Sequence, residues 1–158
     1  MVSKRVRDSQ VEMRELVLPN DTNPLGTILG GKVMHLMDVA AAMSAMKHSG
    51  KTVVTVSVDH IDFLSPIKMG QIIVIKASVN YVHRTSMEVG VKVWAEDFKT
   101  GKKTHTSSAY FTFVALDEDG KPTRVPEIIP ETEEEKRRYR EAQERRKVRL
   151  ARRRNKSG

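Results

Sequence analysis

The stretch GGKVMHLMDVAAAMSAMKHSG, residues 30–50, is the part of the sequence that decides the fold. Most of its residues are Ala, Met, Leu or Val, which suit a helix, and apolar side chains occupy nearly the whole helical circumference. Gly50 is a typical helix stop, and Lys47 and His48 place basic groups in the last turn. The stretch therefore predicts one long helix over residues 30–49 that is buried on nearly all sides.

The sequence after this helix follows the period of two that is typical of strands, and a short strand is also expected at residues 11–18. Val54, Val56 and Val58 share one parity, whereas Ile61 and Phe63 take the other. This change of phase predicts a bulge or strong bend near residues 59–60. Three more strands are predicted, with the following residues on one face: Ile73, Ile75, Ala77, Val79 and Tyr81; Met87, Val89, Val91, Val93 and Ala95; Ala109, Phe111, Phe113 and Ala115.

One long helix followed by consecutive strands with short turns favours an antiparallel meander over alternating strand–helix–strand units. The helix must lie across one face of such a sheet. The predicted fold class is therefore α+β, with a curved antiparallel sheet wrapped around one buried helix, the arrangement called a hotdog.

The composition suits one intracellular domain. The chain has 158 residues, of which 39% are hydrophobic and 30% charged, so a second catalytic domain does not fit. It contains no Cys, which excludes disulfides, thiolate metal sites and Cys nucleophiles. There is no run of about 20 apolar residues and no apolar signal segment at the start, so we expect a cytoplasmic protein.

The net charge of +8 is concentrated at the end of the chain. Residues 136–158 hold 12 Lys and Arg against 2 Glu, whereas residues 1–135 hold 16 Lys and Arg against 18 acidic residues. We therefore divide the chain into a domain at residues 1–130 and a charged, basic C-terminal helix or disordered tail at residues 131–158, which we expect to be solvated. No specific binding of nucleic acid is expected, although weak contact with an anionic surface is open to such a tail.

Asp38 is the most informative polar residue, because it is a carboxylate in the middle of an otherwise apolar helix. Small side chains one and two turns later, Ala41, Ala42 and Ala45, leave space beside it. It could act as a general base or a nucleophile, or it could only pair with His35 one turn earlier. The five His show no close pair on one helical face, so no metal site is predicted, and the G-x-S-x-G and G-x-G-x-x-G motifs are absent.

Several segments together resemble a known family. They are Asn23 in its loop, the helix with its GG and MD pairs, VSVDHIDFLSPIKMG at residues 56–70, HRTSMEV at 83–89 and AYFTFVALDEDGKP at 109–122. Over residues 11–126 the chain resembles the hotdog acyl-CoA thioesterases of the cytosolic (brain-type) acyl-CoA hydrolase group. The resemblance implies hydrolysis of fatty acyl-CoA to free acid and CoA without a cofactor. It also implies a homo-oligomer with a dimer of hotdogs as its minimum, often a trimer of dimers.

The resemblance also implies roles for individual residues. Asn23 and Asp38 match the catalytic residues of the family, and in relatives they can come from opposite subunits, as we predict here. An amide such as Asn23 can hold a water or donate to a developing oxyanion. The other predicted site residues are Gly30 and Gly31 at the helix start for the oxyanion or substrate, where close packing is the alternative, and Arg84, Thr85 and Ser86 for CoA.

Two other functions stay open at this point. A hotdog hydratase or dehydratase acting on acyl-thioesters would use a His–carboxylate pair, for which His35 and Asp38 are candidates. A non-enzymatic acyl-CoA-binding regulator would use the basic tail to bind nucleic acid. The preferred acyl chain length depends on how far the pocket extends between helix and sheet, and the sequence does not specify it.

Overall fold

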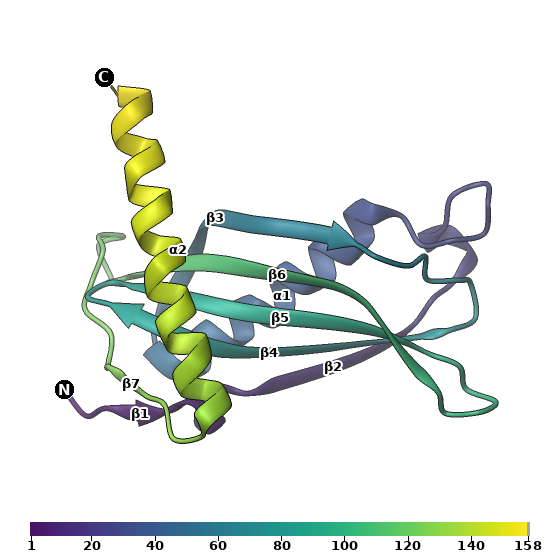
Figure 1. Cartoon of the computed structure of the whole chain (residues 1–158), viewed down its shortest axis with the longest axis horizontal. Helices are drawn as coiled ribbons and strands as arrows, with labels where there is room; N and C mark the ends of the chain where they lie inside the picture. Colours follow the sequence, from purple (N-terminus) through teal and green to yellow (C-terminus); the bar gives the residue numbers. More distant parts are fainter. Residues whose placement is uncertain (158) are drawn as a thin grey trace.

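The computed structural model describes residues 1–157 and shows a long helix against one face of a curved sheet, with a second helix crossing the opposite face (Figure 1). Two 3-10 turns, η1 and η2, lie near the start of the chain. The elements in order are β1 Lys4–Arg5, η1 Val6–Ser9, β2 Val11–Leu16, η2 Pro19–Asp21, α1 Gly30–Ser49, β3 Thr52–Phe63, β4 Ile72–His83, β5 Ser86–Glu96, β6 Lys103–Leu116, β7 Ile128–Ile129 and α2 Glu133–Ser157.

The main sheet has five strands in the order β2-β4-β5-β6-β3, and every neighbouring pair is antiparallel. The predicted α+β hotdog architecture is therefore confirmed. The predicted bend near residues 59–60 is confirmed too, because the register between β3 and β6 shifts between Asp59 and Asp62 and His60 has a φ of 48°. A second register shift lies between Thr55 and Ser57, so β3 changes the face it presents more than once.

Helix α1 packs on the sheet with one side only. Val33 and Met37 are buried at 1% and 0% exposure, but Met34 and Met46 are 44% and 50% exposed. The prediction that α1 is buried on nearly all sides is therefore wrong for a single chain, because one sheet can cover only part of a helix. The predicted end at Gly50 is confirmed: its φ of 66° is left-handed, and its N–H donates to the Met46 carbonyl at 2.8 Å.

The C-terminal segment forms helix α2, which crosses the outer face of the sheet and extends beyond the β3 edge (Figure 1). A capping box starts it: the Glu135 N–H donates to Thr132 Oγ1 at 3.1 Å, and the Thr132 N–H donates to Glu135 Oε1 at 3.4 Å. The helix is not wholly solvated as expected, because Ala142 is only 1% exposed and the rings of Tyr139 and Tyr81 lie edge to face at 5.0 Å. Neither long helix in residues 1–157 has the apolar character that crossing a membrane requires.

Candidate active site

Asp38 lies midway along α1, partly exposed, where it meets strand β3. The Thr55 hydroxyl donates a hydrogen bond of 2.7 Å to Asp38 Oδ1. This bond fixes the carboxylate and leaves Oδ2 for another partner. Within residues 1–157 no ion pair joins Asp38 to His35, so the purely structural pairing considered from the sequence is not formed.

Sequence reasoning missed Thr55, because it used the alternation in β3 only to group Val54, Val56 and Val58 on one parity. The structure leaves these three valines 41–42% exposed, while Thr55 is paired with Phe113 of β6 and bonds to the helix. A period of two shows that one face is apolar but not what covers it. The signal in the sequence was a hydroxyl side chain that alternates with the valines of this strand.

Asn23 organises the loop that leads into α1. Its Oδ1 accepts hydrogen bonds from the N–H groups of Leu25 at 2.9 Å and Thr27 at 3.2 Å, and its Nδ2 donates to Thr27 Oγ1 at 2.9 Å. The side-chain oxygen is therefore occupied by the loop, whereas Nδ2 keeps a second hydrogen. Of the two roles open to this amide, donation to an oxyanion fits these contacts better than holding a water through its oxygen.

Gly30 and Gly31 begin α1, where the first backbone N–H groups have no carbonyl one turn earlier. The residue before them, Leu29, has no side chain that can cap these donors. A Cβ at Gly31 would meet no atom within 4 Å, so its backbone faces open space. A Cβ at Gly30 would lie 3.7 Å from the Phe63 ring. The Gly31 amide is therefore the more accessible donor for a substrate oxygen.

One chain does not bring these groups together. Gly31 and Asp38 are seven residues apart in one helix, which separates them by about 10 Å along its axis. The loop of Asn23 precedes the same end of α1 as Gly31, since the Leu29 N–H donates to the Asp21 carbonyl at 2.9 Å. Gly31 of one chain therefore lies too far from its own Asp38 for both to contact one thioester carbon.

Arg84 and Thr85 form the turn between β4 and β5, and Ser86 begins β5. Three hydrogen bonds hold this turn: Ser86 Oγ donates to the His83 carbonyl at 3.1 Å, and the Arg84 and Thr85 carbonyls each accept a backbone N–H at 3.0 Å. Arg84 itself is exposed and has a φ of 54°. Burial lowers the pKa of the His83 imidazole, and the positive charges of Arg146 and Arg84 lower this pKa further. The turn is therefore a rigid, cationic end of the sheet.

The turn and Asp38 lie toward the same end of the sheet. Thr55, the partner of Asp38, pairs with Phe113, which pairs with Met87, which pairs with Val82. This row crosses four neighbouring strands, about 14 Å, and ends just before the turn. The chain thus supplies Asp38 and the turn on one side, and Asn23 with Gly31 at the other end of α1.

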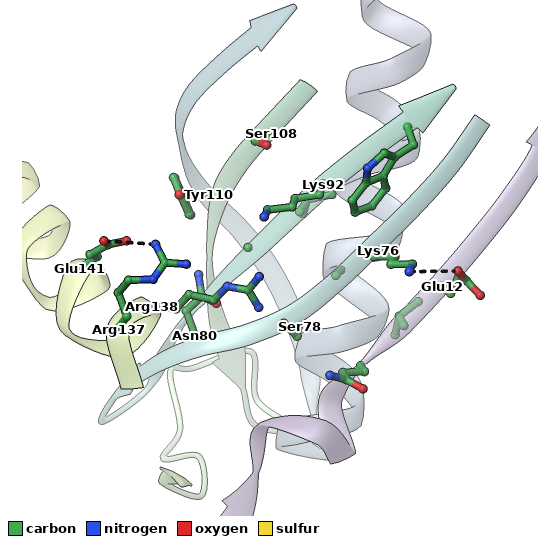
Figure 2. Close-up of a pocket in the computed structure, with 16 residues that line it drawn as sticks. Glu12, Lys76, Ser78, Asn80, Lys92, Ser108, Tyr110, Arg137, Arg138 and Glu141 are labelled. Atoms are coloured by element: carbon green, nitrogen blue, oxygen red, sulfur yellow. Dashed lines mark hydrogen bonds and ion pairs between the residues drawn. The ribbon is translucent and has the colours of Figure 1, made fainter. Parts of the chain in front are cut away.

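A cavity of about 490 Å³ lies elsewhere, on the outer face of the sheet beside α2 (Figure 2). Lys76, Lys92, Tyr110, Arg137 and Glu141 are among its lining residues, and Figure 2 shows Lys76 paired with Glu12 and Arg137 with Glu141. None of the seven predicted site residues lines it. In residues 1–157 no group of three or more His, Cys, Asp or Glu is placed to hold a metal ion.

Two relatives have names that concern acyl-CoA. An uncharacterized acyl-CoA thioester hydrolase of Bacillus subtilis, YkhA, is 43% identical over 129 residues, 82% of this chain and 75% of that protein. The cytosolic acyl coenzyme A thioester hydrolase of Rattus norvegicus is 39% identical over 135 residues, 84% of this chain but only 35% of the rat protein.

Several solved structures of acyl-CoA hydrolases are closely similar to this chain. An acyl-CoA hydrolase of Staphylococcus aureus, in complex with butyryl coenzyme A and coenzyme A, has a TM-score of 0.92 and 42% identity over 98% of this chain and 94% of that one. A hexameric acyl-CoA thioesterase without ligand has a TM-score of 0.93 and 45% identity over 96% and 97%. Other structures of the S. aureus enzyme carry an aspartate, a threonine or an asparagine changed to alanine.

Residues 25–102 match the family model described as the thioesterase superfamily. This range contains the helix with Asp38, the edge strand with Thr55 and the turn at Arg84. With the relatives above and the hotdog architecture, the match leads to one conclusion: the chain belongs to the thioesterase superfamily.

Proposed function

We propose that the protein hydrolyses fatty acyl-CoA to a free fatty acid and CoA. The observation that carries this proposal is the Asp38 carboxylate, held by the Thr55 hydroxyl at 2.7 Å in an otherwise apolar helix. The S. aureus hydrolase has been changed to alanine at an aspartate, a threonine and an asparagine, the same residue types as Asp38, Thr55 and Asn23. Names of the relatives support the substrate class.

In the proposed mechanism Asp38 acts as a general base. Its Oδ2 takes a proton from a water, and the water oxygen forms a bond to the thioester carbon. The Gly31 N–H and Asn23 Nδ2 of a second copy donate to the oxyanion that results. The carbon–sulfur bond then breaks, and the sulfur of CoA receives the proton from Asp38. Water, one carboxylate and fixed hydrogen-bond donors supply every proton transfer and bond change of the reaction, so the proposed mechanism uses no cofactor.

Direct attack by the Asp38 carboxylate on the thioester is the alternative for the same residue. A single turnover in ¹⁸O-labelled water distinguishes the two. Attack by water places the label only in the fatty acid. Attack by Asp38 forms an anhydride, and its hydrolysis at the enzyme carbonyl leaves label in the protein, which mass spectrometry of the peptide with Asp38 detects.

The proposed assembly is a homo-oligomer built from hotdog dimers, with a trimer of dimers as the larger form. Edge strand β3 exposes Val54, Val56 and Val58, and α1 exposes Met34 and Met46, so apolar surface borders the site on the single chain. The separation of Asp38 from Gly31 also requires a second copy. Hexameric thioesterases among the solved structures support this assembly.

Three further parts of the proposal concern the rest of the chain. Arg84, Thr85 and Ser86 bind the CoA part of the substrate, as their rigid cationic turn allows. Residues 1–130 carry the chemistry, and residues 131–158 are an accessory segment. We place the enzyme in the cytoplasm, which the lack of Cys and the similarity to the rat cytosolic hydrolase support.

The test is Asp38→Asn, assayed with palmitoyl-CoA and a reagent for the released thiol. Because the amide keeps the shape but cannot take a proton, we expect turnover to fall by at least about 100-fold while CoA binding persists. Thr55→Val should lower turnover less, by about tenfold, because it only loosens the carboxylate. Asp119→Asn, an exposed carboxylate in the turn after β6, is the control. Near-normal turnover of Asp38→Asn would remove Asp38 from the mechanism.

A further inference from the structure

Helix α2 is locked onto the outer face of the sheet by buried charges. Arg145 donates from Nε and Nη2 to both oxygens of Glu88, at 2.8 and 2.9 Å, and its guanidinium lies 3.5 Å from the centre of the Tyr110 ring. The Glu88 side chain is only 3% exposed. With the contact between Tyr139 and Tyr81 at 5.0 Å, these bonds fix the position of α2 relative to β4 and β5.

Arg146 follows Arg145 on the side of α2 that faces the turn between β4 and β5. It lies in line with Tyr139 and Ala142, at helical spacings of seven and four residues, and Tyr139 contacts Tyr81, which is two residues before His83. Its charge reaches His83, since Arg146 and Arg84 both lower the pKa of that imidazole after the effect of burial. Arg146 therefore points a cation toward the turn from a fixed helix.

The charge at this place is not neutralised. Within residues 1–157 neither Arg146 nor Arg84 has an acidic side chain within 4 Å, and both the partly exposed Arg146 and the exposed Arg84 act on His83 with a positive charge. Several other cations on α2 have acidic partners: Lys136, Arg137, Arg138, Arg145, Lys147 and Arg149. A turn that two guanidinium groups without acidic partners approach favours binding of an anion with several oxygens.

We propose that Arg146 of α2 joins Arg84 in binding the phosphate groups of the CoA nucleotide. The inference rests on the proposed function and extends the site to a helix outside the residues that match the family model. The geometry suits a long substrate: the thioester lies at Asp38 near Thr55, and the row of paired strands leads from Thr55 about 14 Å to the turn. Phe113 and Met87 of this row are buried, so the uncharged pantetheine arm covers a comparable distance outside the row, and the phosphates reach the arginines.

Isothermal titration calorimetry with CoA, 3′-dephospho-CoA and pantetheine tests this proposal. Arg146→Gln should raise the Kd of CoA about tenfold and leave the Kd of pantetheine, which has no nucleotide phosphates, unchanged. Arg146→Lys keeps the charge and should recover most of the affinity. Arg140→Gln is the matched control, because it removes the same charge from an exposed position on the side of α2 opposite Ala142. The Kd of 3′-dephospho-CoA, which lacks the 3′-phosphate, shows whether Arg146 contacts the 3′-phosphate or the pyrophosphate: only a contact with the pyrophosphate makes Arg146→Gln raise this Kd.

Three results would overturn the proposal. The first is a CoA Kd of Arg146→Gln within twofold of wild type, and the second is an equal loss of affinity for pantetheine. The third is an equal loss of CoA affinity in Arg140→Gln, which would show that only the overall positive charge of α2 matters. If Arg146→Gln does not fold, Arg146→Met takes its place in the same titrations, because it also removes the charge, and the same thresholds for CoA and pantetheine apply to it. Failure of Asp38→Asn to lose turnover would instead refute the proposed function, so the two failures are distinguishable.

Discussion

The pair of Arg145 and Glu88 makes a quantitative prediction about stability. Arg145→Met removes the cation but keeps an unbranched apolar stem, and it leaves the Glu88 carboxylate, 3% exposed, with Asn80 Nδ2 at 3.0 Å as its remaining partner. Removing one partner of a buried ion pair costs about 3–5 kcal/mol. Because α2 can separate from the sheet and admit water to Glu88, we expect a loss near 3 kcal/mol in the free energy of unfolding. For a chain of this length that corresponds to roughly 6–12 °C in Tm.

The assay is urea unfolding, followed by circular dichroism and by the fluorescence of Trp94, at one fixed protein concentration because oligomers unfold in a concentration-dependent way. A double-mutant cycle with Glu88→Gln isolates the pair, and we expect the double variant to be less destabilised than the sum of the single variants by about 2 kcal/mol. Lys147→Met is the control, since Lys147 and Glu144 form an exposed pair with 73% and 71% side-chain exposure. That change should alter stability by less than about 0.5 kcal/mol. An equal effect of Arg145→Met and Lys147→Met on the free energy of unfolding would refute the stabilising role of the pair of Arg145 and Glu88.

Three further predictions concern the assembly, the C-terminal helix and pH. Mixing inactive Asn23→Ala chains with inactive Asp38→Ala chains should restore about a quarter of wild-type turnover, because half of the randomly formed dimers hold one intact site; no recovery, with exchange confirmed by mass, would place both residues of a site on one chain. A chain ending at Pro130 should keep its turnover number but show a higher, salt-sensitive KM for acyl-CoA and a lower Tm; loss of turnover at every ionic strength would show that α2 completes the active site. His48 donates from Nε2 to the Pro126 carbonyl at 2.6 Å while its Nδ1 is buried without a partner, and burial lowers the pKa of this imidazole below 6.5. The neutral His48 therefore contributes fully to stability above pH 6.5, and this contribution is lost as the pH falls toward the folded-state pKa. The free energy of unfolding of His48→Phe in urea should then depend less on pH between about 7 and 5 than that of the wild type. The same pH dependence in both proteins would contradict this.

Local patterns were enough to predict the main elements. Helix α1 follows from its run of helix-forming residues and its end at Gly50, and the strands follow from a period of two interrupted by turns. Asp38 was conspicuous in the sequence because a carboxylate among apolar helix residues is costly to bury without a partner. These features depend on neighbours within a few residues along the chain, and the sequence shows such neighbours directly.

The tertiary structure alone decided which groups meet. Thr55 reaches Asp38 because β3 lies beside α1, and a pattern that is read along one strand does not show the strand or helix opposite it. The oxygen of Asn23 is occupied by its own loop, which follows from backbone geometry and not from the residue type. Arg145 and Glu88 are 57 residues apart, and charges alone did not distinguish this buried pair from the exposed pairs along α2. The sequence by itself determined the elements and the unusual carboxylate; the contacts between distant segments depended on how α1 and α2 pack on opposite faces of the sheet, because burial and hydrogen bonding across such distances arise only when the chain has folded.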